Sequence, residues 1–250
     1  MLSYTSRPAL FLCAALFGMC GPLAPAVRAQ TPQPEDIVVL LSSDGALQSS
    51  AWQGELAFVQ YLNQNMPGRT STRLSILQYS TAVTTRYNLT DSQKPSTINN
   101  VLTGLSYDNG NTSLKTAVQD AINLFDAQSD PLNPKLLILL ADHEANPVTQ
   151  DISSAEISTL AADHIPLLAY EGGILTIPSS YFQNATNSTG GAIYSTDGTP
   201  YSSTTVANAE AAQFLIDAAP YFNQGIPEPG ALGLLAVGVV AISARRRRRA

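Results

Sequence analysis

Three adjacent residues carry side chains suited to proton transfer: Asp142, His143 and Glu144 follow the apolar run 136–140. Carboxylates beside an imidazole at the end of a strand are groups that general acid–base catalysis uses. His164 is the only other histidine, and the sequence has neither an H-E-x-x-H zinc motif nor a G-x-S-x-G nucleophile motif. We therefore expect His143 to be a surface-loop residue and the protein not to be an enzyme. A hydrolase is the least favoured alternative.

The elements that must position such residues lie between residues 30 and 225, which we expect to form one domain. Continuous apolar runs predict strands buried on both faces, and apolar residues every three or four positions predict helices. The expected strands are 37–41, 73–80, 82–89, 136–140, 165–170 and 192–195, the second and third forming a hairpin. The expected helices are 51–65, 96–105, 113–127, 151–163 and 206–222. This alternation predicts an α/β fold, namely a doubly wound, mostly parallel central sheet with one antiparallel edge strand.

In such sheets ligands bind at the carboxyl ends of the strands, so the loops to inspect follow Leu41, Leu140 and Tyr170. Segments near two of these loops resemble the von Willebrand factor A-type domain: residues 36–46 resemble its first strand and loop, and 136–142 its fourth strand, which ends in an aspartate. Gly110-Asn111-Thr112, just before a helix, is similar to its threonine loop. The resemblance covers roughly residues 35–222 and implies the fold of that family. The rival is a flavodoxin-like fold, which the early antiparallel hairpin fits poorly.

The resemblance also implies a metal-ion-dependent adhesion site (MIDAS), where three loops hold Mg²⁺ or a similar ion through oxygens and a partner's carboxylate completes it. In the first-loop pattern D-x-S-x-S, Ser42 takes the place of the aspartate, Asp44 that of the first serine and Ala46 that of the second. Thr112 and Asp142 match their motif positions. The implied ligands of Mg²⁺ or Ca²⁺ are therefore Ser42, Asp44, Thr112 and Asp142. Because Ala46 has no ligand oxygen, a degenerate, metal-free domain stays open as an alternative.

The C-terminal segment 226–250 has three parts in order. Pro227, Glu228 and Pro229 come first, an uncharged run continues to Ala244, and the chain ends in the cluster Arg245, Arg246, Arg247, Arg248 and Arg249. As a helix the run 229–244 would span about 24 Å, which is marginal for a hydrocarbon core of about 30 Å. This order resembles a PEP-CTERM sorting signal. The resemblance implies a transmembrane helix, recognition by an exosortase, and release or transfer to the cell surface or an exopolysaccharide matrix; an ordinary tail anchor is the alternative.

The N-terminal segment 1–29 predicts a signal peptide. A basic residue precedes the apolar run 9–20, and Val27-Arg28-Ala29 provides a small residue at the cleavage site. A buried N-terminal helix is the alternative. Both cysteines, Cys13 and Cys20, lie in this segment, so we expect the exported protein to have no disulfide and no cysteine-bound metal. The positive-inside rule keeps the C-terminal arginines cytoplasmic and places the domain outside the inner membrane.

The charge balance of the chain bears on whether it binds nucleic acid. Of thirteen Lys and Arg residues, five form the terminal cluster and two lie in the signal peptide, so six basic residues face nineteen acidic ones in the rest of the chain. A body this acidic repels phosphate backbones, which argues against nucleic-acid binding.

Together these features predict an exported binding or adhesion module. It would contact a protein or polysaccharide through its strand-end loops, and an exosortase would process it after transient anchoring in the membrane. The alternative is a structural component of the exopolysaccharide matrix whose domain has lost ligand binding.

Overall fold

The computed structural model describes residues 35–44, 49–141, 151–171, 180–195 and 203–222. The predicted signal peptide, the predicted C-terminal transmembrane helix and the residues Asp142, His143 and Glu144 lie outside these ranges. Among the described helices, none combines the length and the apolar character needed to cross a membrane.

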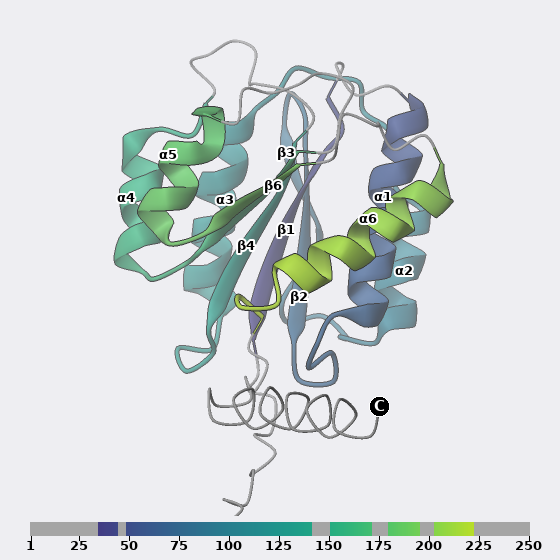
Figure 1. Ribbon diagram of the computed structural model, residues 1–250, viewed down its shortest axis with the longest axis horizontal. Helices are drawn as coiled ribbons and strands as arrows, with labels where there is room; N and C mark the ends of the chain where they lie inside the picture. Colours follow the sequence, from purple (N-terminus) through teal and green to yellow (C-terminus); the bar gives the residue numbers. More distant parts are fainter. Residues whose placement is uncertain (1–34, 45–48, 142–150, 172–179, 196–202, 223–250) are drawn as a thin grey trace, which may run out of the picture. The chain divides into compact units, whose positions relative to one another are not determined.

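Six strands form one sheet in the order β3-β2-β1-β4-β5-β6 (Figure 1). They are β1 Asp36–Ser42, β2 Arg73–Tyr79, β3 Val83–Tyr87, β4 Lys135–Ala141, β5 Leu167–Glu171 and β6 Ala192–Ser195. Every neighbouring pair is parallel except β2 and β3, which are antiparallel as the predicted hairpin requires. The sheet therefore confirms the predicted fold class, with β3 as the antiparallel edge strand.

The central strands are apolar along their length because neither face of the sheet meets solvent. β1 lies between β2 and β4, with Ile37 level with Leu136 and Val38 level with Leu137. Every residue of β1 is buried, and so is every residue of β4 after Lys135. Parallel strands covered by helices on both sides need no polar face, which explains the unbroken apolar runs in the sequence.

The helices form two layers, one on each face of the sheet (Figure 1). The first layer is α1 Ser49–Asn65, α2 Pro95–Thr103 and α6 Thr204–Asp217; the second is α3 Leu114–Gln128, α4 Ser154–Ala162 and α5 Ser180–Thr189. Side chains alternate along β1. Ile37, Val39 and Leu41 pack in the core under the first layer, and Val38 and Leu40 pack in the core under the second.

The two largest differences between expected and observed helix ends have local causes. The helix expected over 151–163 begins later because Ser153 caps it, and Glu156 accepts the N–H of Ser153 in return. The helix expected over 206–222 ends earlier because of Pro220. A proline has no N–H to donate, and its ring disfavours helical geometry at the preceding residue.

At the amino end of β1, Asp36 joins the neighbouring strand to the loop between α3 and β4. Its buried carboxylate accepts hydrogen bonds from Nε and Nη2 of Arg73, each at 2.7 Å, from the hydroxyl of Ser129 at 2.8 Å and from the amide of Asn133 at 3.1 Å. Burial alone would raise the pKa of Asp36, but these hydrogen bonds and the charge of Arg73 outweigh it, so the pKa lies below its usual value of 3.8. The edge opposite the strand-end loops is thus fixed by an ion pair between the buried Asp36 and the partly exposed Arg73.

Candidate functional site

The candidate site begins where β1 ends. Ser42, Ser43 and Asp44 are all buried, with no more than 1% of any residue exposed. Alternate residues of an extended chain face the same side. Ser42 and Asp44 therefore lie together, and the Ser42 hydroxyl donates to Oδ2 of Asp44 at 3.0 Å.

Thr112 reaches the same carboxylate from a loop 68 positions further along the chain. Its hydroxyl donates to Oδ2 of Asp44 at 2.9 Å, and the residue is 4% exposed. The next residue, Ser113, stands immediately before α3, at the N-cap position. The structure thus brings three of the four predicted ligands, Ser42, Asp44 and Thr112, together around one carboxylate oxygen.

Backbone contacts hold the threonine loop against the end of β1. The N–H of Asn109 donates to the backbone oxygen of Ser43 at 2.9 Å, and Asp44 forms a parallel bridge with Gly110. A Cβ atom at Gly110 would lie 2.4 Å from Oγ1 and 2.8 Å from the backbone nitrogen of Thr81. A larger residue would push the loop away, so glycine is what allows this close approach.

Two tyrosines that the sequence did not single out tie the strand ends together. The hydroxyl of Tyr107 donates to the backbone oxygen of Asp44 at 2.6 Å. The backbone oxygen of Tyr79, at the end of β2, accepts the N–H of Ser43 at 2.9 Å, and the Tyr79 hydroxyl donates to the backbone oxygen of Leu140 at 2.8 Å. The ends of β1, β2 and β4 therefore form one connected edge. No local pattern marks these contacts, since each joins residues far apart in the sequence.

The predicted ligand Asp142 and the substituted position Ala46 lie outside the described residues. Within the part of the chain that the structure describes, no three Asp, Glu, His or Cys side chains gather in a way that could hold a metal ion. The described part of the candidate site is therefore one carboxylate with two hydroxyls.

These three side chains fit a hard cation by chemical type. Mg²⁺ and Ca²⁺ take carboxylate and hydroxyl oxygens, and the hydroxyls of Ser42 and Thr112 keep lone pairs while they donate to Asp44. One carboxylate supplies little charge for a divalent ion. A complete site would therefore need Asp142 as the second carboxylate.

Glu171, which the sequence reasoning missed, adds a buried carboxyl group to the same edge. It ends β5, level with Ala141 in β4 and Ser195 in β6, and is 8% exposed. Its Oε1 is buried without a hydrogen-bond partner among the described residues, and burial raises the pKa of this carboxyl group. An acidic residue directly after the apolar run 165–170 was the signal that could have found it.

Comparison with protein families gives two matches. The von Willebrand factor type A domain matches residues 36–213, and the PEP-CTERM protein-sorting motif matches residues 225–249. No protein of curated function matches the chain.

Solved structures similar to this chain include proximal thread matrix protein 1 from the mussel byssus, with a TM-score of 0.61 and 18% identity over 76% of this chain and 49% of that one. A structure of the same mussel protein with a zinc-occupied MIDAS motif has a TM-score of 0.60 and 19% identity, covering 75% and 48%. A von Willebrand factor type A protein from Catenulispora acidiphila has a TM-score of 0.59 and 12% identity, covering 73% and 42%. The match thus spans about half the length of these chains, and at such identities it shows the fold.

Proposed function

The chain belongs to the von Willebrand factor type A domain family and carries a PEP-CTERM sorting motif, and from this premise we propose that it is an exported binding module of the cell surface or extracellular matrix. The observation that carries the proposal is the meeting of Ser42 and Thr112 on the carboxylate of Asp44. These residues stand at the carboxyl edge of the sheet, where folds of this class bind ligands.

The proposed chemistry at this edge is cation-mediated adhesion. Ser42, Asp44, Thr112 and Asp142 would hold Mg²⁺ or Ca²⁺, and a bound ion would offer a coordination position to a carboxylate of a protein or polysaccharide partner. The two hydroxyls orient the Asp44 carboxylate by donating to it. Because Gly110 has no side chain, the threonine loop can pack closely against Thr81, which helps to keep Thr112 beside Asp44.

We further propose the route by which the domain is delivered. Residues 1–29 direct export, 30–225 form the binding domain, and 226–250 form the sorting segment that an exosortase recognises and processes. Before processing, the helix over 229–244 anchors the chain in the inner membrane with the arginine cluster on the cytoplasmic side.

A structural matrix protein with a metal-free domain is the second candidate. Ala46 removes one oxygen from the first-loop pattern, which weakens coordination of a hard cation. Such a domain would keep the fold and the hydrogen bonds around Asp44 without an ion.

Thermal unfolding of the full-length protein in EDTA, Mg²⁺ and Ca²⁺ separates the two candidates. An ion that binds the native state stabilises it by RT ln(1 + [L]/Kd), about 2.7 kcal/mol at a hundred times Kd. We expect a rise in the Tm of the wild type that Asp44→Asn abolishes. Asp126→Asn, which makes the same charge change at an exposed position of α3, should keep the rise. A wild-type Tm that does not respond to either ion would favour the metal-free matrix protein.

A further inference from the structure

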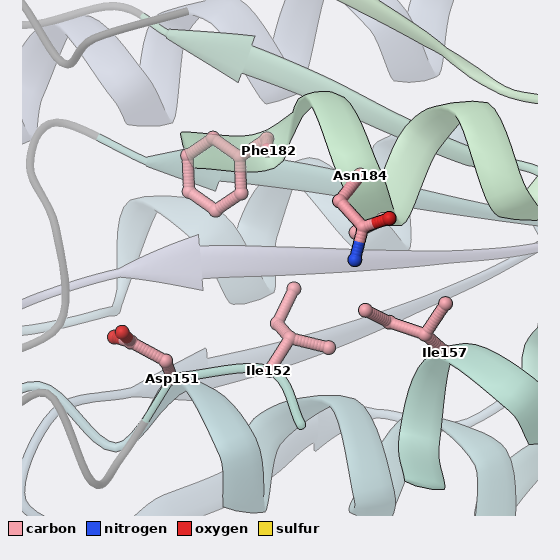
Figure 2. Close-up of a pocket in the computed structure, with 6 residues that line it drawn as sticks. Asp151, Ile152, Ile157, Phe182 and Asn184 are labelled. Carbon is pink, nitrogen blue, oxygen red and sulfur yellow. The ribbon is translucent and has the colours of Figure 1, made fainter. Parts of the chain in front are cut away.

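A pocket of about 130 Å³ opens between α4 and α5. Figure 2 shows the ring of Phe182 on one side of it and the side chains of Ile152 and Ile157 on the other, with Asp151 and Asn184 at opposite ends. A space of this size and lining takes a small, largely apolar group with polar atoms at its two ends. The adhesion proposal does not use this pocket.

The amide of Asn184 faces the pocket, with its nitrogen directed toward the isoleucine side (Figure 2). Two other exposed amides on α5 are paired with each other, since Nε2 of Gln183 donates to Oδ1 of Asn187 at 2.8 Å. An amide nitrogen carries two N–H donors. The amide of Asn184 has no hydrogen-bond partner among the described residues, so both of its donors are available to a ligand in the pocket.

The two helices that flank the pocket present an uncharged polar surface. The sequence of α5 has no charged residue, and α4 has one, Glu156, which is buried in the capping box. Their exposed positions carry hydroxyl and amide groups, among them Ser158, Thr159 and Ser188. Apart from Asp151, the described residues that line the pocket are uncharged, so this face suits a neutral, hydroxyl-rich ligand better than an anionic one.

We propose that the pocket between α4 and α5 binds the acetamido group of an N-acetylated amino sugar in a polysaccharide. The inference rests on the proposed function, because it names a ligand class for the exported domain. An acetamido group has four non-hydrogen atoms, and a pocket of about 130 Å³ has room for a group of this size. Its methyl group would contact Phe182 and the isoleucines, its carbonyl oxygen would accept from Asn184, and its N–H would face the Asp151 end.

Ligand-observed NMR with the full-length protein tests this assignment through four small probes. N-acetylglucosamine carries the acetamido group, glucose lacks it, glucosamine replaces it with an ammonium, and Nε-acetyllysine presents it without a sugar. We expect N-acetylglucosamine to bind and glucose not to bind. Glucosamine binding as tightly would show a cation site at Asp151, and tighter binding of acetyllysine would show a site for a modified protein. Either result, or no binding of N-acetylglucosamine to the folded protein, would overturn the proposal.

A matched pair of variants on α5 locates the binding. Asn184→Asp replaces the donor with a carboxylate that repels the acetyl oxygen, and we expect about tenfold weaker binding of N-acetylglucosamine or more. Asn187→Asp makes the same charge change on the same helix away from the pocket lining and should leave binding unchanged. Unchanged binding by Asn184→Asp would contradict the proposed site.

The metal response of Asp44 is a separate readout from sugar binding. Sugar binding without any Mg²⁺ or Ca²⁺ effect on the Tm would remove the cation-mediated function and leave this pocket assignment standing. A metal effect without sugar binding would do the reverse.

Discussion

The hydroxyl of Thr112 lies 2.9 Å from Oδ2 of Asp44, so a loop before α3 and the loop after β1 share one carboxylate oxygen although they are 68 positions apart. Ser42 donates to the same oxygen. Hydrogen bonds from two sides fix the direction of the carboxylate, and a fixed carboxylate is what a coordination site with an open position needs.

The first prediction concerns this contact. Thr112→Val keeps the shape of the side chain but removes its hydroxyl, so we expect the free energy of unfolding to fall by about 1 kcal/mol. The rise in Tm with Mg²⁺ or Ca²⁺ should also shrink, whereas Thr112→Ser, which keeps the hydroxyl, should retain the ion response and most of the stability. Thermal unfolding with and without the ions measures them. A full ion response in Thr112→Val would exclude the threonine hydroxyl from the metal site.

The ion pair at the opposite edge predicts a loss of stability in acid. Asp36→Asn leaves Arg73, whose side chain is 27% exposed, without its charged partner, and hydrogen bonds to a charged group contribute about 1.5–3 kcal/mol. Because the pKa of Asp36 is lowered in the folded state, its stabilisation is complete above the usual value of 3.8 and is lost as the pH falls further. Urea unfolding between pH 2 and 7 should show a steep acid loss in the wild type that is missing in Asp36→Asn. Asp126→Asn should follow the wild type.

Glu171 predicts the opposite dependence on pH. Burial raises the pKa of its carboxyl group, so its contribution to stability is present below the usual value of 4.5 and is lost as the pH rises through the folded value. Glu171→Gln should therefore be more stable than the wild type at pH 7, with the difference disappearing near pH 4. Urea unfolding at the two pH values measures it. A difference that is the same at both would mean that ionisation of Glu171 is not responsible.

The burial of each isoleucine predicts whether it can be replaced by a charged residue. Ile138 is completely buried in β4, where an unpaired charge costs several kcal/mol, so Ile138→Asp should abolish soluble expression. Ile216 is 67% exposed on α6, and Ile216→Asp should express as the wild type does. Normal folding of Ile138→Asp would contradict the placement of β4 inside the sheet.

The mass of the secreted protein tests the proposed delivery. Removal of both terminal segments predicts a mature chain from about Gln30 to about Gly225, measured by intact mass spectrometry of protein recovered from medium or matrix. Detection of a secreted chain that keeps Arg245–Arg249 would exclude sorting by removal of the tail.

Most of the fold could be predicted from the sequence because its strongest signals are local. The apolar runs 37–41 and 136–140 became β1 and β4, and the near-continuous pair 73–80 and 82–89 became the antiparallel hairpin. The errors at helix ends also had local causes, since the capping pair Ser153 and Glu156 is visible in the sequence.

The candidate site was less predictable because its contacts are long-range. Asp44 and Thr112 were found through resemblance to a family, and nothing in their own neighbourhoods indicated that they would touch. Tyr107 and Glu171 were missed, since a tyrosine in a loop or an acid at a strand end acquires its role from residues that the topology brings beside it.

The position of β1 has a mechanical consequence. Its hydrogen bonds run to β2 on one side and β4 on the other, and all three strands point the same way. A tensile force that enters at Asp36 and acts along β1 loads both ladders in shear, so many bonds must break at once, and the contacts from Arg73 resist at the point of attachment. A force that peels the edge strand β3 opens one ladder bond by bond. A domain built this way resists stretching through the amino end of β1 more strongly than it resists peeling at its edge.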